Sequence, residues 1–306
     1  MSRFIFKRLI QMLFTLLVVI TATFFLMHAI PGGPFTREKP LPPEIIQALN
    51  AKYHLNEPLY MQYLDYLKGV LTFNFGPSFQ KVGVQVTELI KLGFPASASI
   101  GGLAILAVLI IGIPLGMIAA LKQGKWQDYC VSVVSTLGVT IPSFVIATFI
   151  IFLFSAKLKI LPAFGLNDWK GYIGPTISLS AFALAFVAKL MRSSMLEVLH
   201  QDYIRTARAK GLSEFVVIFK HALKNSLIPV ITYMGPMVAA ILTGSFVTEK
   251  IFAIAGMGQY FVQSVTNRDY TVILGITIMF AGFYILMVFL VDIIYTLIDP
   301  RIQLHD

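Results

Sequence analysis

Charged residues are scarce in this sequence. Asp, Glu, Lys and Arg make up 13% of the 306 residues, whereas soluble domains carry about 25%. An ordinary cytosolic enzyme, a disordered protein and a coiled coil all need more charge, so the composition excludes these three classes. The single cysteine, Cys130, excludes a disulfide framework and any zinc or iron–sulfur site built from several cysteines.

Sequence motifs for nucleotide binding and hydrolysis are missing as well. No G-x-x-x-x-G-K-[ST] loop is present, so the chain cannot hold ATP phosphates in that way. Neither an H-E-x-x-H helix nor a G-x-S-x-G turn occurs. The five histidines share no spacing typical of metal ligands. We therefore expect no catalytic residue, no bound cofactor and no metal site in this chain.

The sequence is instead rich in apolar residues, at 57%, and they gather in long runs. Crossing about 30 Å of hydrocarbon takes about 20 residues of α-helix. Six runs without Asp, Glu, Lys or Arg approach or exceed this length: residues 9–30, 97–121, 131–156, 171–188, 225–248 and 270–291. Their apolar residues are continuous rather than alternating, which excludes an outer-membrane barrel. The sequence therefore predicts an all-α integral membrane protein with six transmembrane helices.

The distribution of basic residues predicts the orientation of these helices. A net charge of +9 is typical of nucleic-acid binders, but a membrane protein also keeps lysine and arginine on its cytoplasmic side. With both termini inside, Lys and Arg are denser in the inner segments than in the outer ones. The first run is longer than the apolar part of a signal peptide, and no clear cleavage site follows it. We therefore expect an uncleaved first helix and two cytoplasmic termini.

Two connecting segments are too long to be simple loops. Residues 31–96 predict an external subdomain after the first helix, with a polar helical stretch and an aromatic-rich stretch. Residues 189–225 predict a cytoplasmic loop between helices 4 and 5, where basic charge is densest. The predicted organisation is a first helix within residues 1–30, the external subdomain, and a five-helix core over residues 97–306 that includes the cytoplasmic loop.

The most informative segment lies in this cytoplasmic loop and predicts two short helices. The first covers about residues 202–210, and Gly211 follows where helices commonly end in a left-handed residue. Ser213 is placed to cap the second helix. Arg205 and Arg208 are three residues apart and so neighbours on the first helix. The second helix shows an apolar stripe at helical spacing, made of Phe215, Ile218, Phe219 and Ala222.

Two interpretations of this loop remain open on residue chemistry alone. A basic loop beside a membrane can bind anionic lipid headgroups. That role, however, needs neither a glycine break nor two helices. A rigid pair of helices at the membrane surface is suited to binding a partner protein and moving with it.

The segment resembles the coupling loop of ABC importer permeases, in the form found in peptide and nickel permeases. The order R-T-A-R-A-K-G-L over residues 205–212 is usual in that subclass. Against the general pattern of Glu-Ala-Ala, Gly and Ile-x-Leu-Pro, the matching residues are Ala207, Gly211 and Leu223. The residues that depart from the general pattern, in the manner of the peptide subclass, are Arg205, Thr206, His221 and Lys224.

The resemblance extends along nearly the whole chain. Residues 41–58, 76–79, 243–252, 267–270 and 298–302 are similar to the corresponding parts of oligopeptide permeases. The chain is thereby identified as a member of the peptide/nickel permease family of ABC importers, and it resembles the B-type transmembrane subunits of oligopeptide importers.

This resemblance implies the type I ABC importer permease fold and peptide import by alternating access across the bacterial cytoplasmic (inner) membrane. It implies as partners a C-type permease that completes a heterodimer, two cytoplasmic ATPases that hold ATP and Mg²⁺, and an external peptide-binding protein. This chain would then be non-catalytic. Small Ala207 would let the ATPase approach closely, and the basic residues would pair with its acids. The residues implied in ATPase docking are Tyr203, Arg205, Thr206, Ala207, Arg208, Lys210, Gly211 and Leu212.

Three other functions compete with this interpretation. A dipeptide, murein-peptide or nickel permease of the same family fits the same motifs. A carrier driven by an ion gradient predicts inverted halves with paired broken helices, and the sequence shows no such pairing. An intramembrane protease needs a serine–histidine or paired-aspartate arrangement. Ser245 and His28 are present, but no G-x-S-G motif surrounds the serine.

Overall fold

The computed structural model describes residues 2–30, 34–35, 43–242 and 246–298. Across these residues the chain is helical and forms no β-strand, and Pro77 and Gln85 make a single isolated bridge. The predicted all-α fold class is therefore confirmed. The positions outside the described residues include Ser245 and parts of the motifs at residues 41–58, 243–252 and 298–302.

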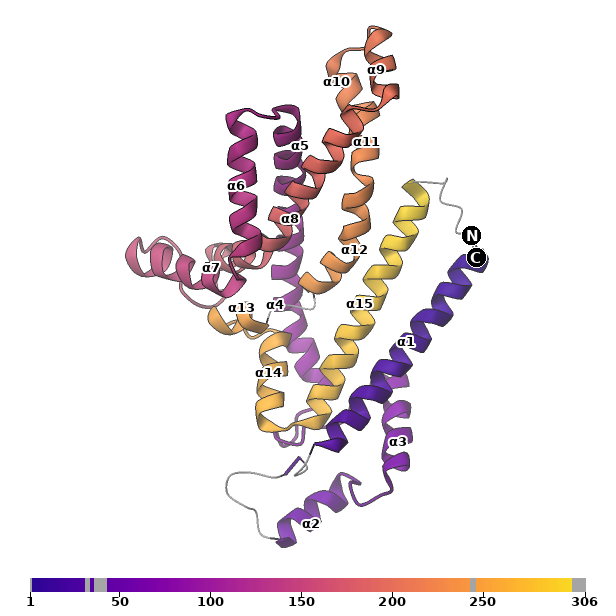
Figure 1. The fold of residues 1–306 in the computed structure, drawn as a ribbon. Coiled ribbons are helices and arrows are strands. Elements are labelled where there is room, and N and C mark those ends of the chain that lie inside the picture. The colour runs from indigo at the N-terminus through magenta and orange to yellow at the C-terminus, as the bar shows by residue number, and fades with distance from the viewer. Residues whose placement is uncertain (1, 31–33, 36–42, 243–245, 299–306) are drawn as a thin grey trace. The chain divides into compact units, whose positions relative to one another are not determined.

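The helical elements follow the chain in the order shown by Figure 1. Most are α-helical, whereas η1, η2 and η4 are π-helical and η3 is a 3₁₀ turn. Their bounds are α1 (Ser2–Ala29), α2 (Pro43–Lys52), α3 (Leu59–Leu71), α4 (Val86–Ala107), η1 (Val108–Gly112), α5 (Ile113–Leu121), α6 (Trp126–Thr140), α7 (Ser143–Ile150), η2 (Ile151–Lys157), η3 (Trp169–Tyr172), α8 (Ile173–Leu199), α9 (Asp202–Ala209), α10 (Glu214–Val216), η4 (Val217–Ala222), α11 (Leu223–Ser226), α12 (Ile228–Leu242), α13 (Phe246–Ile251), α14 (Met257–Asn267) and α15 (Tyr270–Ile298).

The described part of the chain has five helical stretches that are long and apolar enough to cross a membrane. A sixth is present if α6 and the helix formed by α7 and η2 count as one span, bent by 104°. The bend falls at Pro142, which disfavours helical geometry in the residue before it, and Ile141 is accordingly extended. The predicted six spans are confirmed in this form, with the third one broken.

The chain divides into two compact units. The first contains Met1–Ala96 and Ala255–Ile285, and the second contains Ser97–Ile254 and Leu286–Asp306. Helices α4 and α15 each contribute residues to both units. The assignment of separate roles to residues 1–30, 31–96 and 97–306 stays a prediction.

In the first unit, the segment between α1 and α4 packs onto α1 and the start of α15. The hydroxyls of Tyr63 in α3 and Thr21 in α1 lie 2.6 Å apart. Asp269 is buried directly before α15, and it accepts hydrogen bonds from the Ser78 hydroxyl and, at 3.0 Å, from the Phe79 amide. The segment that the sequence predicts to be an external subdomain therefore shares this unit's core with the apolar helices.

In the second unit, α8 packs against α5, α6, α7 and α12. Glycine permits the closest approaches. A Cβ atom on Gly116 of α5 would lie 2.5 Å from the carbonyl oxygen of Ala188 and 2.6 Å from Cβ of Met191. A Cβ atom on Gly138 of α6 would lie 2.8 Å from Cβ of Ala185. Small residues at such crossings let helix backbones touch, which is how helices associate in a membrane.

We predict that Gly116→Ala lowers the stability of the protein by about 1–3 kcal/mol, because the new methyl group meets a backbone carbonyl that cannot move aside cheaply. The measurement is the thermal unfolding midpoint of the purified protein in detergent. Gly102→Ala is the matched control, since Gly102 also lies within a helix and a Cβ atom there would have no neighbour within 4 Å. Equal midpoints for the two variants would contradict the prediction.

Candidate functional site

The candidate site lies in the segment that joins α8 to α12. Two residues separate the end of α8 from the start of α9, and a turn then leads into α10, η4 and α11. Figure 1 shows α9 and α10 beyond the end of α8, at the same end of the second unit as the turn between α5 and α6. The predicted pair of helices is therefore present and projects from one end of this unit.

The turn after α9 has the geometry of a helix ended by a left-handed residue. Gly211 has φ +76°, and its amide donates to the carbonyl of Arg208 at 2.9 Å. The amide of Leu212 reaches back to the carbonyl of Ala207 at 3.4 Å. These two hydrogen bonds form the Schellman motif, which confirms the conformation predicted for Gly211. A Cβ atom there would have no neighbour within 4 Å, so the backbone conformation and not space favours glycine.

An ion pair spans the same turn on its solvent-exposed side. The guanidinium of Arg208 donates to both carboxylate oxygens of Glu214, at 2.8 and 3.3 Å. Both side chains are solvent-exposed, so the pair contributes at most about 1 kcal/mol to stability. Its geometric effect is to join the end of α9 to the start of α10. Arg208 thus has a partner within its own chain before any other protein binds.

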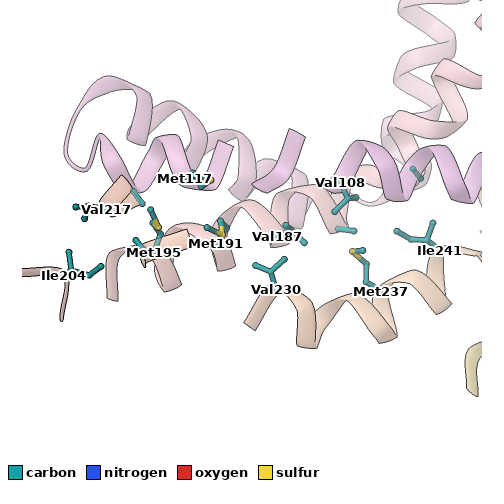
Figure 2. Close-up of a cluster of buried hydrophobic side chains, with 14 of the residues drawn as sticks. Val108, Met117, Val187, Met191, Met195, Ile204, Val217, Val230, Met237 and Ile241 are labelled. Atoms are coloured by element: carbon teal, nitrogen blue, oxygen red, sulfur yellow. The ribbon is translucent and has the colours of Figure 1, made fainter. Parts of the chain in front are cut away.

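The inner face of α9 is anchored in the core of the second unit. Ile204 and Ala207 are buried three residues apart, and they belong to the same hydrophobic cluster as Met195 of α8 and Val217 of η4. Figure 2 shows Ile204 and Val217 beside Met195, at the end of a row of buried side chains. The sequence predicts that Ala207 lets a partner approach closely. The structure corrects this prediction, because Ala207 faces the chain's own core.

The two phenylalanines of the predicted apolar stripe lie side by side but face solvent. Phe215 and Phe219 are 69% and 49% exposed, whereas Val217 and Ala222 are fully buried. The reason is the π-helical turn η4, which pairs residues five apart and so brings Val217 and Ala222 to one side. Ser213 occupies the N-cap position of α10, as predicted, but its side chain makes no capping hydrogen bond.

The outer surface of this segment combines basic and apolar groups. Arg205, Lys210 and Leu212 are exposed, and the rings of Phe215 and Phe219 contact each other in a tilted arrangement with centroids 4.6 Å apart. Aromatic residues and arginine are enriched where proteins bind one another. The sequence does not single out the two phenylalanines as contact residues, because an apolar stripe at helical spacing does not indicate whether it faces the core or the solvent.

Two further predicted residues make hydrogen bonds within the segment. The Tyr203 hydroxyl accepts a hydrogen bond from the Asn225 side chain at 2.7 Å, which ties α9 to α11. The Thr206 hydroxyl donates to the carbonyl of Asp202 at 3.0 Å. Arg205 lies 3.8 Å from the Asp202 carboxylate, and both groups are open to solvent. In the described residues, no three His, Cys, Asp or Glu side chains gather in a way that could hold a metal ion.

These features define a helical, multi-pass membrane protein. Comparison with known protein families then identifies the family. Residues 112–304 match the family described as "Binding-protein-dependent transport system inner membrane component", and residues 1–100 match the N-terminal counterpart of that family. The chain belongs to this family, and it is accordingly a multi-pass inner membrane protein.

Relatives of the chain match it over its full length. It is 49% identical to the dipeptide transport system permease protein DppB of Bacillus subtilis, over 100% of this chain and 99% of that protein. It is 46% identical to the oligopeptide transport system permease protein OppB of Haemophilus influenzae, over 99% of this chain and 100% of that protein. The resemblance to peptide ABC permeases that the motifs indicate is therefore confirmed.

A solved structure shows the same fold. The inward-facing MetNI methionine ABC transporter matches with a TM-score of 0.58 and 17% sequence identity, over 69% of this chain and 97% of that one. At this identity the likeness concerns the fold alone. The predicted type I ABC importer permease fold is confirmed by it.

We predict that Ile204→Ala loosens α9 from the core, because removing a fully buried side chain costs about 2–5 kcal/mol when the cavity does not close. Amide hydrogen exchange along α9 measures the effect as faster exchange, since local opening becomes easier. Arg205→Ala is the matched control. The Arg205 side chain is exposed, so its loss should leave amide exchange along α9 unchanged. Unaltered exchange in Ile204→Ala would show that α9 is not held by this contact.

Proposed function

We propose that this chain is the B-type transmembrane subunit of an ATP-driven importer that carries oligopeptides into the bacterial cytoplasm by alternating access. The observation that carries the proposal is the α9–α10 helix pair, whose inner side chains are buried in the core and whose outer side chains are exposed. It occurs in a chain whose relatives are named as peptide permeases. The chain itself is non-catalytic, and energy arrives from partner subunits that bind ATP and Mg²⁺.

The proposed assembly contains a second, C-type permease, two cytoplasmic ATPases and an external peptide-binding protein. Both termini of this chain are cytoplasmic, in agreement with the density of basic residues. This orientation places the α9–α10 pair on the cytoplasmic side, where an ATPase can reach it. The family's description as binding-protein-dependent supports the external partner.

ATPase docking is assigned to the outer surface of the α9–α10 pair. The predicted residues at or near this surface are Tyr203, Arg205, Thr206, Arg208, Lys210, Gly211 and Leu212, and the structure adds Phe215 and Phe219. Ala207 is left out of this surface because it is buried. Movement of the ATPases would push on the exposed groups. The buried side chain of Ile204 would then pass that movement to α8.

A dipeptide permease is the second candidate, and the 49% identity to a dipeptide permease favours it. Both candidates use the same fold and the same partners, so substrate specificity separates them. Murein-peptide and nickel permeases are further outcomes of the same specificity test.

The decisive experiment is co-expression with the neighbouring genes, purification in detergent, and measurement of ATP hydrolysis with and without peptide and binding protein. A complex with a second permease and two ATPases, in which peptide stimulates hydrolysis, supports the proposal, and the length of the stimulating peptide assigns the substrate class. A stable chain alone that takes up substrate with an ion gradient would refute it in favour of a carrier.

We predict that Gly211→Val abolishes peptide uptake while the chain still inserts into the membrane. A β-branched residue in the left-handed conformation costs at least about 1–2 kcal/mol, so the turn between α9 and α10 would change. Gly211→Asn is the matched control, because asparagine tolerates this conformation and should keep most of the uptake. Normal peptide uptake by Gly211→Val would contradict the prediction.

A further inference from the structure

A partly buried ion pair joins α6 to α8 away from the docking surface. The guanidinium of Arg192 binds the carboxylate of Asp128 in a bidentate manner, with Nε 2.5 Å from Oδ1 and Nη2 2.8 Å from Oδ2. The Asp128 side chain is 6% exposed and that of Arg192 is 30% exposed. The two residues are 64 positions apart in the sequence, so the pair connects separate helices.

The same carboxylate also holds the turn between α5 and α6. Oδ2 of Asp128 accepts a hydrogen bond from the Gly124 amide at 3.0 Å. Gly124 has φ +72°, as a tight turn between two antiparallel helices requires. Asp128 therefore links the tip of the α5–α6 hairpin to α8.

Arg192 lies on the part of α8 whose buried side chains share a hydrophobic cluster with α9. Met191 and Met195 of α8 are fully buried, and they belong to the same hydrophobic cluster as Ile204 of α9 and Met117 of α5. Figure 2 shows Met191 and Met195 following one another along α8, with Ile204 beyond Met195. Arg192 is thus on the stretch of α8 that lies between α9 and the rest of the unit.

A bidentate ion pair is suited to fixing the position of α6 relative to α8. A buried pair adds little net stability compared with apolar residues of the same size. A bidentate guanidinium–carboxylate pair does, however, fix the distance and the orientation of two helices, since both hydrogen bonds must be aligned together. The apolar contacts of α5 and α6 with α8 lack this directionality.

We propose that Asp128 and Arg192 are positioning residues that make the α5–α6 hairpin move with α8 and α9 as one body during the transport cycle. The inference rests on the proposed function, because it concerns how movement of the ATPases reaches the membrane-spanning helices. Without the pair, α5 and α6 still pack on α8 through Gly116 and Gly138, but the tip of the hairpin around Gly124 is no longer held to α8 and does not follow its movement.

The first test measures a distance in the complete importer complex. Nitroxide labels are attached to Gln123→Cys in the α5–α6 turn and His200→Cys after α8, in a Cys130→Ser background. Double electron–electron resonance is recorded without nucleotide and after trapping with ATP and vanadate. We expect the same distance distribution in both states, and a state-dependent distribution when Asp128→Asn is added. A distance that changes without Asp128→Asn, or one that stays constant with it, would overturn the proposal.

The second test compares uptake with hydrolysis in proteoliposomes. Asp128→Asn and Arg192→Lys each remove the bidentate geometry, and we expect peptide taken up per ATP hydrolysed to fall about tenfold or more while hydrolysis continues. Glu197→Gln removes an exposed acid from the same helix and serves as the matched control. Parallel loss of uptake and hydrolysis in both variants, or no loss in either, would overturn the proposal.

The two tests also separate this inference from the proposed function. If the unaltered complex takes up no peptide, the proposed function fails, whereas the label distances still show whether the hairpin and α8 move together. If the complex takes up peptide and the variants keep their full coupling, the inference about the pair fails alone.

Discussion

Close contact between helix backbones along α8 is the constraint on which the second unit depends. In a membrane the hydrophobic effect does not drive one helix against another, so helices must gain from packing at short range. Gly116 and Gly138 supply that packing because each faces α8 with no side chain in the way. Helix α8 can therefore hold α5 and α6 on one stretch and the cluster around Ile204 at its end.

Much of this arrangement was predictable from the sequence, because its signals are local. The six apolar runs predict the spans, since length and continuity suffice in a solvent without hydrogen-bond partners. Gly211 predicts the left-handed end of α9 in the same way, since a single backbone conformation explains it. The burial of Ile204 and Ala207 is a finding of the structure, because the exposed role of Ala207 followed only from the resemblance to permease coupling loops.

Other features could not be predicted, because they depend on partners far away in the sequence or on small changes of register. Nothing near Asp128 in the sequence indicates that Arg192 will bind it. The burial of Val217 in place of Phe215 follows from the π-helical turn, which residue spacing at helical period does not reveal. The fold was therefore easier to predict than the set of side chains that face outward at the candidate site.

The π-helical turn η4 has a consequence for how this family can change in length. A π-helical turn arises when a helix holds one residue more than the regular pattern needs. A turn of π-helix holds about one residue more than a turn of α-helix, so the extra residue is accommodated with little change in the phase of the helix on either side. Loss of a single residue between Val217 and Ala222 would restore regular α-helix while Phe215 keeps its exposed position relative to α12. The length of this segment can therefore change by one residue at η4 without changing which side chains before it are displayed.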